Sequence, residues 1–196
     1  ERLGNEGYAF ANANAVPEID RAKRTVSFTI MVDPGRRVYV RRINVVGNTR
    51  TRDEVVRREL RQLEGAFYDG SKLTLSKTRV DRTQFFSEVD IDTTPVAGST
   101  DQVDVTLKVK EKPTGSMLIG VGLSSAEGVV AQGSVSQTNF LGSGNTVGGS
   151  FNTGKINQNL SFSFTDPYYN VDGLSRGFEV HKRRTNAAAL NLGDYS

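Results

Sequence analysis

The sequence contains no cysteine, no tryptophan and only one histidine among its 196 residues. Without cysteine the chain has neither a disulfide framework nor a thiolate metal site, although this absence does not identify a compartment. No apolar run approaches the roughly 20 residues of a transmembrane helix. Residues 1–15 also lack the basic stretch and apolar run of a signal peptide. These absences exclude a stapled scaffold, a thiolate centre and a helical membrane span.

Charge is concentrated in one part of the chain. Residues 1–113 hold 37 of the charged residues, and residues 114–196 hold only 10. Glycine is distributed the other way, with 7 before Pro113 and 13 after it. Two different solvents explain this change, so we place a domain boundary at residues 111–115, where proline and glycine break regular structure. The net charge of +3 is weak support for an anionic partner, because basic and acidic residues nearly balance.

The first part alternates strands with two helical segments. Residues 38–46 form a predicted strand, and a helix follows in which Val56, Leu60 and Leu63 make the apolar stripe before Gly65 ends it. The other predicted elements are a helix over 71–84 and strands over 89–93 and 103–110. This order predicts an α+β module, a three-stranded sheet covered on one face by two helices. Earlier in the chain, residues 8–10 and 25–32 are predicted to be the last two strands of a preceding copy.

After Pro113 only a period of two remains. The alternating segments each have one apolar face and one small or polar face, and they lie at residues 117–124, 129–136, 147–152, 159–165 and 178–181. Such hairpins are the signature of a transmembrane β-barrel with lipid outside and water inside. Soluble β-sandwiches alternate too. The uncharged polar face and the aromatic residues at strand ends, Phe140 and Tyr168-Tyr169, favour the membrane barrel.

Longer stretches carry a family resemblance. In the first part these are Tyr39-Val40-Arg41-Arg42-Ile43, Arg57-Arg58-Glu59-Leu60, Phe85-Phe86 and Asp101-Gln102-Val103-Asp104-Val105; in the second they are Asn139-Phe140-Leu141-Gly142-Ser143-Gly144 and Asp166-Pro167-Tyr168-Tyr169. The chain resembles the bacterial outer-membrane assembly factors of the polypeptide-transport-associated (POTRA) and surface-antigen family. Thr83-Gln84 departs from the family, which often has an apolar residue and glycine there.

The resemblance implies a domain order and a function. Residues 37–112 would be the last POTRA module, residues 1–36 the C-terminal part of the module before it, and residues 114–196 the first about five strands of an outer-membrane barrel. The family folds and inserts other barrel proteins without ATP, in the cell outer membrane of Gram-negative bacteria, with its POTRA modules in the periplasm. The implied partners are unfolded outer-membrane proteins, accessory outer-membrane lipoproteins and the lipid bilayer.

Two candidate sites follow. The first barrel strand is the expected edge for strand augmentation, in which an incoming strand pairs with exposed backbone groups; its residues are Ser116, Leu118, Ile119, Gly120 and Gly122. Gly120 and Gly122 fit a weakly paired seam, although small residues can also simply fill a tapering lumen. The second site is Arg58-Glu59, which matches the family segment that docks a lipoprotein. A solvated charge cluster is the plain alternative. The strand near residues 89–94 is a further edge for extended peptides.

Other functions have less support. The single His181 has no neighbouring cysteine or carboxylate pair and falls on a polar strand face, so we expect no catalytic residue, metal site or cofactor. The arginines are interleaved with acidic residues, which argues against nucleic-acid binding. The main alternative is a transporter of the same superfamily that exports a substrate through its own barrel. A purely soluble periplasmic scaffold is the third possibility.

Overall fold

The computed structural model describes residues 2–21, 23–125, 127–170 and 172–186. The described residues form two compact units. The first comprises the chain up to Asn48 together with Val56–Glu111, and the second comprises Thr49–Val55 together with the chain from Lys112 onward. A short stretch of the first part of the sequence, Thr49–Val55, is therefore packed with the second unit.

The first unit opens with a short helix and a long hairpin. Helix α1 (Arg2–Asn5) precedes strands β1 (Asn12–Asp20) and β2 (Thr25–Asp33), which pair antiparallel. The predicted strand over 25–32 is confirmed. The predicted strand over 8–10 is wrong, because Tyr8 lies in a turn where its backbone N–H donates to the carbonyl of Leu3.

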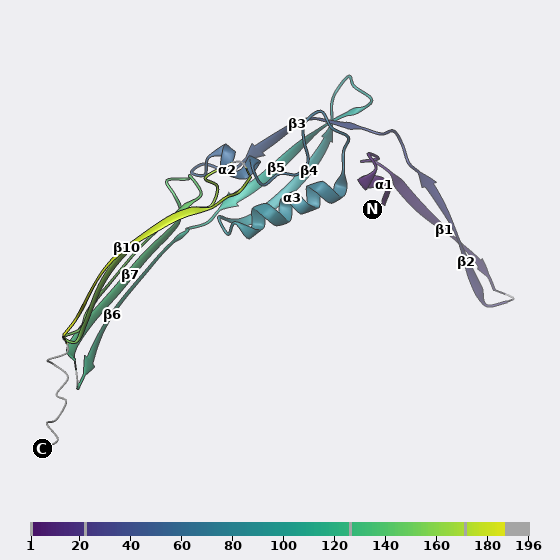
Figure 1. Cartoon of the computed structure of the whole chain (residues 1–196). Coiled ribbons are helices and arrows are strands. Elements are labelled where there is room, and N and C mark those ends of the chain that lie inside the picture. Colours follow the sequence, from purple (N-terminus) through teal and green to yellow (C-terminus); the bar gives the residue numbers. More distant parts are fainter. Residues whose placement is uncertain (1, 22, 126, 171, 187–196) are drawn as a thin grey trace, which may run out of the picture. The chain divides into compact units, whose positions relative to one another are not determined.

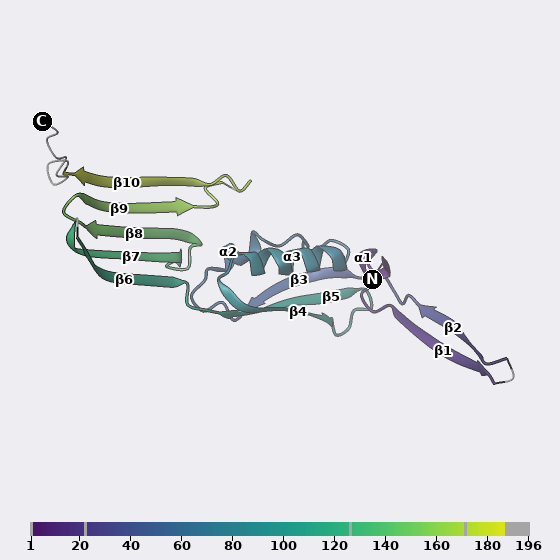
Figure 2. The same cartoon turned by 90° about the horizontal axis from the view of Figure 1, so that it is seen from below.

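The chain from Tyr39 to Glu111 forms the expected α+β module, which belongs to the first unit except for Thr49–Val55. Its elements are β3 (Tyr39–Val46), α2 (Asp53–Arg57), α3 (Gly70–Arg82), β4 (Phe86–Pro95) and β5 (Gln102–Glu111). The strand order is β3-β5-β4, with β3 parallel and β4 antiparallel to β5. Helix α3 runs along the sheet (Figures 1 and 2). The predicted β-α-α-β-β order is confirmed.

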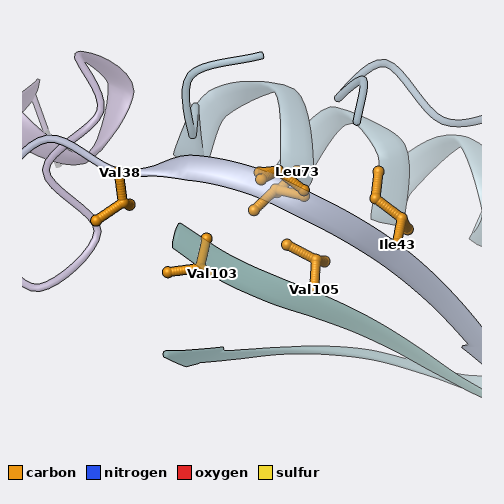
Figure 3. Packing of buried hydrophobic residues seen from close by; sticks show 6 residues of the cluster. Val38, Ile43, Leu73, Val103 and Val105 are labelled. Carbon is orange, nitrogen blue, oxygen red and sulfur yellow. The ribbon is translucent and has the colours of Figure 1, made fainter. Parts of the chain in front are cut away.

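Alternating apolar residues of the central strands form the core of this module. Val103 and Val105 of β5 meet Val40 and Ile43 of β3, and Leu73 of α3 closes the cluster (Figure 3). Each fully buried side chain of this size contributes about 1.5–3 kcal/mol of transfer free energy. This buried cluster makes the strand order and the position of α3 mutually dependent.

The first helix of the module is much shorter than its sequence pattern predicts. Helix α2 ends at Arg57, and the predicted stripe residue Leu63 is exposed rather than buried. Gln62 explains the difference. Its buried side-chain amide donates to the carbonyls of Leu63 and Phe67, and its carbonyl accepts from the N–H of Asp69. These bonds hold a loop in place of further helical turns.

The second helix of the module is close to its prediction. Asp69 caps α3, because its carboxylate accepts from the N–H groups of Ser71 and Lys72. The helix ends at Arg82, and Gln84 adopts a left-handed conformation with φ 62°. This is the position at which the sequence departs from the family's glycine, so the departure places a side chain where glycine is least strained.

The second unit contains one antiparallel sheet. Its strands are β6 (Gly115–Ser124), β7 (Gly128–Phe140), β8 (Asn145–Thr153), β9 (Asn157–Asp166) and β10 (Arg176–Thr185). They follow one another across the sheet in sequence order, as Figure 2 shows. All five predicted alternating segments are strands of this sheet.

Candidate functional site: an open strand edge

Strand β6 forms one edge of the five-stranded sheet. It pairs along its whole length with β7, from Gly115 opposite Gln137 to Ser124 opposite Gly128. Among the described residues, no strand pairs with its other side. In an antiparallel strand alternate residues direct their N–H and C=O groups to opposite sides, so about five residues of β6 offer theirs to the open side. The strand is about 34 Å long, enough to cross an apolar band of about 25 Å when tilted.

The predicted edge residues divide between the two faces of the sheet. Ile119 is aligned with Met117 and Val121 on a face that carries apolar residues in all five strands, and its side chain is exposed. The residues on the opposite face are Ser116, Leu118, Gly120 and Gly122. Leu118 is the one large apolar side chain among these four, and it is exposed as well. The structure thus brings the predicted residues together on one open strand.

The two glycines of β6 have different surroundings. A Cβ at Gly120 would lie 3.3 Å from Nε2 of Gln132, so this glycine allows a neighbouring side chain to approach. A Cβ at Gly122 would meet nothing within 4 Å. Packing within the described residues therefore does not require glycine at position 122. A glycine in a strand interior weakens it, which is the property that an exchangeable edge needs.

The first residues of β6 are tied to β7 by additional hydrogen bonds. The carbonyl of Thr114 accepts hydrogen bonds from the N–H and the hydroxyl of Thr138, and the Thr114 hydroxyl accepts from the Gln137 amide. These bonds tie the beginning of β6 to the end of β7. Among the described residues, the strand thus has one end tied by side-chain hydrogen bonds and one side without a partner strand.

An aromatic cluster lies on the apolar face far from β6. Phe178 stacks on Phe164 at 5.5 Å and lies 6.2 Å from Phe162. At the first residue of β10, the Arg176 guanidinium lies 3.9 Å from the ring centre of Tyr169. An aromatic ring that holds a cation at a strand end is typical of a membrane interface.

The turn after β7 holds the stretch Thr49–Val55 within the second unit. Asn139 is buried with φ 58°, donates from Nδ2 to the Thr51 hydroxyl at 2.8 Å, and accepts from the N–H of Gly144. The N–H of Arg52 donates to the carbonyl of Gly142. A Cβ at Gly142 would lie 1.9 Å from the carbonyl oxygen of Arg50, so only glycine fits there. The sequence did not predict this contact.

The predicted docking residues lie beside α3 in the first unit. The Glu59 side chain is buried and pairs with the Arg79 guanidinium at 2.8 Å. The loop after α2 turns Glu59 towards α3, and docking of a lipoprotein at this segment stays a prediction. Arg58, its neighbour, is partly exposed. Strand β4, the other predicted edge, is an outer strand of the module's sheet.

Two carboxylates of the module have lowered pKa values. A hydrogen bond from Arg41 lowers the pKa of Asp104, against a smaller opposing effect of burial. At Asp69 burial raises the pKa, but hydrogen bonds from the Ser71 hydroxyl and from two backbone N–H groups outweigh burial, so the pKa is lowered overall. Both groups stabilise the module in their ionised form.

Comparison with known proteins gives the family. Residues 38–112 match the POTRA family, described as a surface antigen variable number repeat, and residues 139–196 match the Omp85 superfamily domain. The chain belongs to the POTRA-bearing Omp85 superfamily. Among the described residues, no helix has the length and apolar character that crossing a membrane requires. The same residues contain no cluster of three or more potential metal ligands.

Several Omp85 relatives are similar over most of the chain. The outer membrane protein assembly factor BamA of Neisseria meningitidis serogroup B is 42% identical over 92% of this chain and 23% of the relative. The crystal structure of BamA from Haemophilus ducreyi lacking POTRA domains 1–3 matches 93% of this chain and 34% of that chain, with a TM-score of 0.81 and 38% identity. The chain spans about a quarter of the length of the curated relatives it matches.

A structure with lower sequence identity shares the fold. CdiB from Escherichia coli matches 92% of this chain and 34% of that chain, with a TM-score of 0.52 and 16% identity. The POTRA module followed by antiparallel strands is thus common to both structures. The identity separates them, since BamA of H. ducreyi is the more similar in sequence.

Proposed function

We propose that the chain is a component of the outer-membrane β-barrel assembly machinery, which folds and inserts barrel proteins by strand augmentation without ATP. The observation that carries the proposal is the 42% identity to an outer membrane protein assembly factor over 92% of this chain. Strand β6, a ten-residue strand paired on one side among the described residues, is the edge proposed for augmentation. Unfolded outer-membrane proteins are the substrates. The sheet lies in the cell outer membrane in contact with lipid, and the POTRA module lies in the periplasm.

Backbone pairing supplies the driving force in this proposal. An incoming strand in lipid has unpaired N–H and C=O groups, each costing several kcal/mol in hydrocarbon. Pairing with the open side of β6 removes that cost for both partners, and it does not depend on the sequence of the substrate. One edge therefore accepts many different barrel proteins, and no nucleotide hydrolysis is needed.

Proline at two adjacent edge positions tests the role of β6. Proline removes a backbone donor, and adjacent strand residues direct their N–H groups to opposite sides. Of Ile119→Pro and Leu118→Pro, one removes a donor to the open side and the other breaks the pairing with β7. Each variant is introduced into the full-length protein and reconstituted in lipid vesicles, where insertion of a substrate barrel and the fold of the variant's own barrel are both measured.

The two variants are expected to separate the role of the open side of β6 in insertion from its role in the fold of the protein's own barrel. The variant that leaves the β6–β7 pairing intact keeps its own barrel fold and loses substrate insertion. The other variant loses its own barrel fold. The comparison therefore identifies which of the two residues directs its N–H group to the open side of β6. Normal insertion by both variants would refute the augmentation role of β6.

For the accessory lipoproteins we propose docking at the Arg58-Glu59 segment. The buried pair between Glu59 and Arg79 fixes the loop that carries Arg58 and the exposed Leu63. In this proposal Glu59 positions the docking surface and Arg58 contacts the lipoprotein. Removing one partner of a buried ion pair is strongly destabilising, so the effect of Glu59 is structural as well as electrostatic.

Charge reversal tests the docking surface. Arg58→Glu is expected to abolish co-purification of the lipoproteins while amide exchange over residues 38–112 stays unchanged. Glu59→Lys is expected to abolish co-purification and also to increase exchange around α3, because it places two cations together. Unchanged co-purification by both variants would remove this segment from the docking surface.

The alternative is a transporter of the same superfamily that exports one substrate through its barrel. The fold shared with CdiB is the observation in its favour. Depletion of the protein from cells distinguishes the two functions. Loss of many unrelated outer-membrane proteins supports assembly, whereas loss of a single exported protein supports transport.

The proposed domain limits accompany this function. We assign residues 1–36 to the C-terminal part of a POTRA module, residues 37–112 to the complete last module, and residues 114–196 to the first strands of the barrel. The hairpin β1–β2 exposes Phe28 and Ile30. In the preceding module these side chains would have a partner surface.

A further inference from the structure

The apolar face of the five-stranded sheet has an outer boundary that shifts from strand to strand. We use the name apolar face for the side that carries Met117, Ile119, Val121 and Leu123 of β6 and the residues aligned with them. The outermost apolar residues on this face are Leu123 in β6, Val129 in β7, Phe151 in β8, Leu160 in β9 and Val180 in β10. In each strand, the outermost residue is the one furthest from the turn after β7.

The strand register shows how large the shift is. Val180 is aligned across the sheet with Phe162, Gly149, Val135 and finally Met117. The apolar residues of β6 therefore continue six positions beyond the row of Val180, to Leu123. Strands about 4.8 Å apart and tilted by about 40° differ in height by about 12 Å over four steps, or about five residues. The boundary is thus roughly level with a membrane surface.

Two cations lie on the apolar face immediately beyond this boundary. Lys182 and Arg184 follow Val180 at every second position of β10 and therefore lie on the same face. They are opposite Leu160 and Gln158 of β9. Both side chains are exposed, and among the described residues no carboxylate pairs with either. The one acidic residue of β10, Glu179, is on the opposite face. A cation at this level has access to the headgroups of the outer leaflet.

The same region of the apolar face is hollowed. One depression of about 540 Å³ is lined mainly by residues of this face, among them Phe151, Phe162, Val180 and the small residues Gly133 and Gly149. Residues of the opposite face that lie between them in the strands, such as Ser134 and Ser150, also contribute to its lining. The Phe151 ring covers Gly133, where a Cβ would lie 2.4 Å from its Cε1 atom. The depression is therefore shaped by large side chains around glycines.

A second depression continues the first towards the two cations. It has a volume of about 360 Å³ and is lined by Gln158, Lys182 and Arg184, among others. The two depressions share Phe151, Leu160 and Lys182. An apolar hollow that passes directly into a hollow with two cations matches the two halves of an amphiphilic molecule.

We propose that this surface binds a phosphorylated lipid of the outer leaflet. An acyl chain occupies the apolar depression over Gly133 and Gly149, and the phosphate lies between Lys182 and Arg184. Arginine and lysine together provide a forked donor and a point charge for phosphate oxygens. The inference rests on the proposed function only in placing the sheet in the outer membrane with β10 running outward.

The test measures lipid retention by the full-length protein. The wild type and variants are reconstituted in nanodiscs of phosphatidylcholine with a small fraction of lipid A that carries two phosphates, then extracted, and the bound lipid A is counted by native mass spectrometry. Lys182→Gln/Arg184→Gln is the test variant. Arg183→Gln is the matched control, because it removes an adjacent cation from the opposite face of the same strand.

We expect the double variant to retain at least fivefold less lipid A than the wild type and Arg183→Gln to retain a normal amount. Lipid A without phosphates is expected to be retained as weakly by the wild type as by the double variant. Equal retention by wild type and double variant, or an equal loss in Arg183→Gln, would overturn the site. Correct folding of each variant is checked by its heat-dependent gel migration.

The outcome is distinguishable from failure of the proposed function. Substrate insertion by the Ile119→Pro and Leu118→Pro variants tests the open edge. Both residues line the apolar depression, but both variants leave the two cations, Lys182 and Arg184, in place. If both insert substrates normally while lipid retention depends on Lys182 and Arg184, the edge mechanism fails and the lipid site stands. If lipid retention is indifferent to both cations while a proline abolishes insertion, the lipid site fails alone.

Discussion

Strands β5 and β6 have the same apolar pattern but opposite burial. Four apolar residues alternate in each, Val103, Val105, Leu107 and Val109 in β5 and Met117, Ile119, Val121 and Leu123 in β6. Val103 is fully buried, whereas Leu123 is 86% exposed. Both strands contain ten residues, and only residues 112–114 separate them.

The faces opposite the apolar residues differ in a way that accounts for this contrast. In β5 that face carries Asp104 and Lys108, which require water, and α3 supplies the cover for the apolar side. In β6 it carries serine and glycine, and no helix among the described residues packs on the sheet. A period of two therefore specifies a strand in both cases. The charge of the other face indicates which solvent the apolar face meets.

The largest effect is expected when an apolar residue of β5 is replaced by an acidic one, compared with the same replacement in β6. Val105→Asp places an unpaired carboxylate in the core at 1% exposure, a cost of more than about 4 kcal/mol that is expected to unfold the module. Val121→Asp alters a side chain that is 73% exposed, so it costs little in water and at most about 2 kcal/mol in a bilayer. Amide exchange over residues 38–112 and over 115–185 in the membrane-reconstituted protein measures both effects.

The contrast fails if the two variants behave alike. Loss of protection over 115–185 in water or detergent by Val121→Asp would mean that the apolar face of β6 is covered by protein. Retained protection over 38–112 in Val105→Asp would mean that the module does not depend on its buried cluster.

Sequence patterns predicted strands better than helices, and the reason is physical. Alternation over ten residues survives in any sheet environment, so all five strands of the second unit and three strands of the module were recognised. The helix around Val56 and Leu60 was predicted too long because periodicity does not reveal the buried Gln62 amide, which stabilises a loop through its own hydrogen bonds. The same loop buries Glu59, which looks like a surface residue in the sequence.

Contacts between distant segments account for what the sequence left out. Asn139 and Thr51 are separated by 88 positions, and nothing in either local sequence indicates that they share a hydrogen bond. The open side of β6 was predicted through the family resemblance, since alternation alone does not distinguish an edge strand from a central one. The cations at 182 and 184 became meaningful only when the register placed them beside the apolar hollow.

A second, intermediate effect is expected at the turn that holds Thr49–Val55. Gly142→Val adds a β-branched residue at φ 73° and a clash with the Arg50 carbonyl, at a combined cost of about 2–3 kcal/mol. The Arg52 amide, which donates to Gly142, is expected to exchange at least tenfold faster. Gly173→Val is the matched control, because its φ of 83° is similar but the nearest atom to its Cβ is 3.4 Å away in the Tyr168 ring.

Equal loss of Arg52 protection in both variants would show that the contact between Gly142 and Arg50 does not determine the effect. No change in either would show that the turn does not hold Thr49–Val55 to the second unit. The five strands are expected to keep their protection in both variants, because their ladders do not include this turn.

The smallest effect concerns the helix cap of the module. Asp69→Ala removes the acceptor for the N–H groups of Ser71 and Lys72, at a cost of about 1 kcal/mol at neutral pH. Asp69→Asn keeps an acceptor and is expected to lose less. Chemical denaturation of the first unit, followed by exchange over residues 38–112, measures both losses.

The stabilisation that the Asp69 cap provides is expected to depend on pH. The pKa of Asp69 is lowered from 3.8 in the folded chain, so its ionised form stabilises the fold. That contribution is fully present above about pH 4 and is lost as the pH falls through the lowered pKa. The difference between wild type and Asp69→Asn should therefore disappear in strong acid, with Asp104 adding to the loss in the module as a whole. The five-stranded sheet should resist the same acid, because backbone ladders do not titrate, and an equal acid sensitivity of both units would contradict the contrast between β5 and β6.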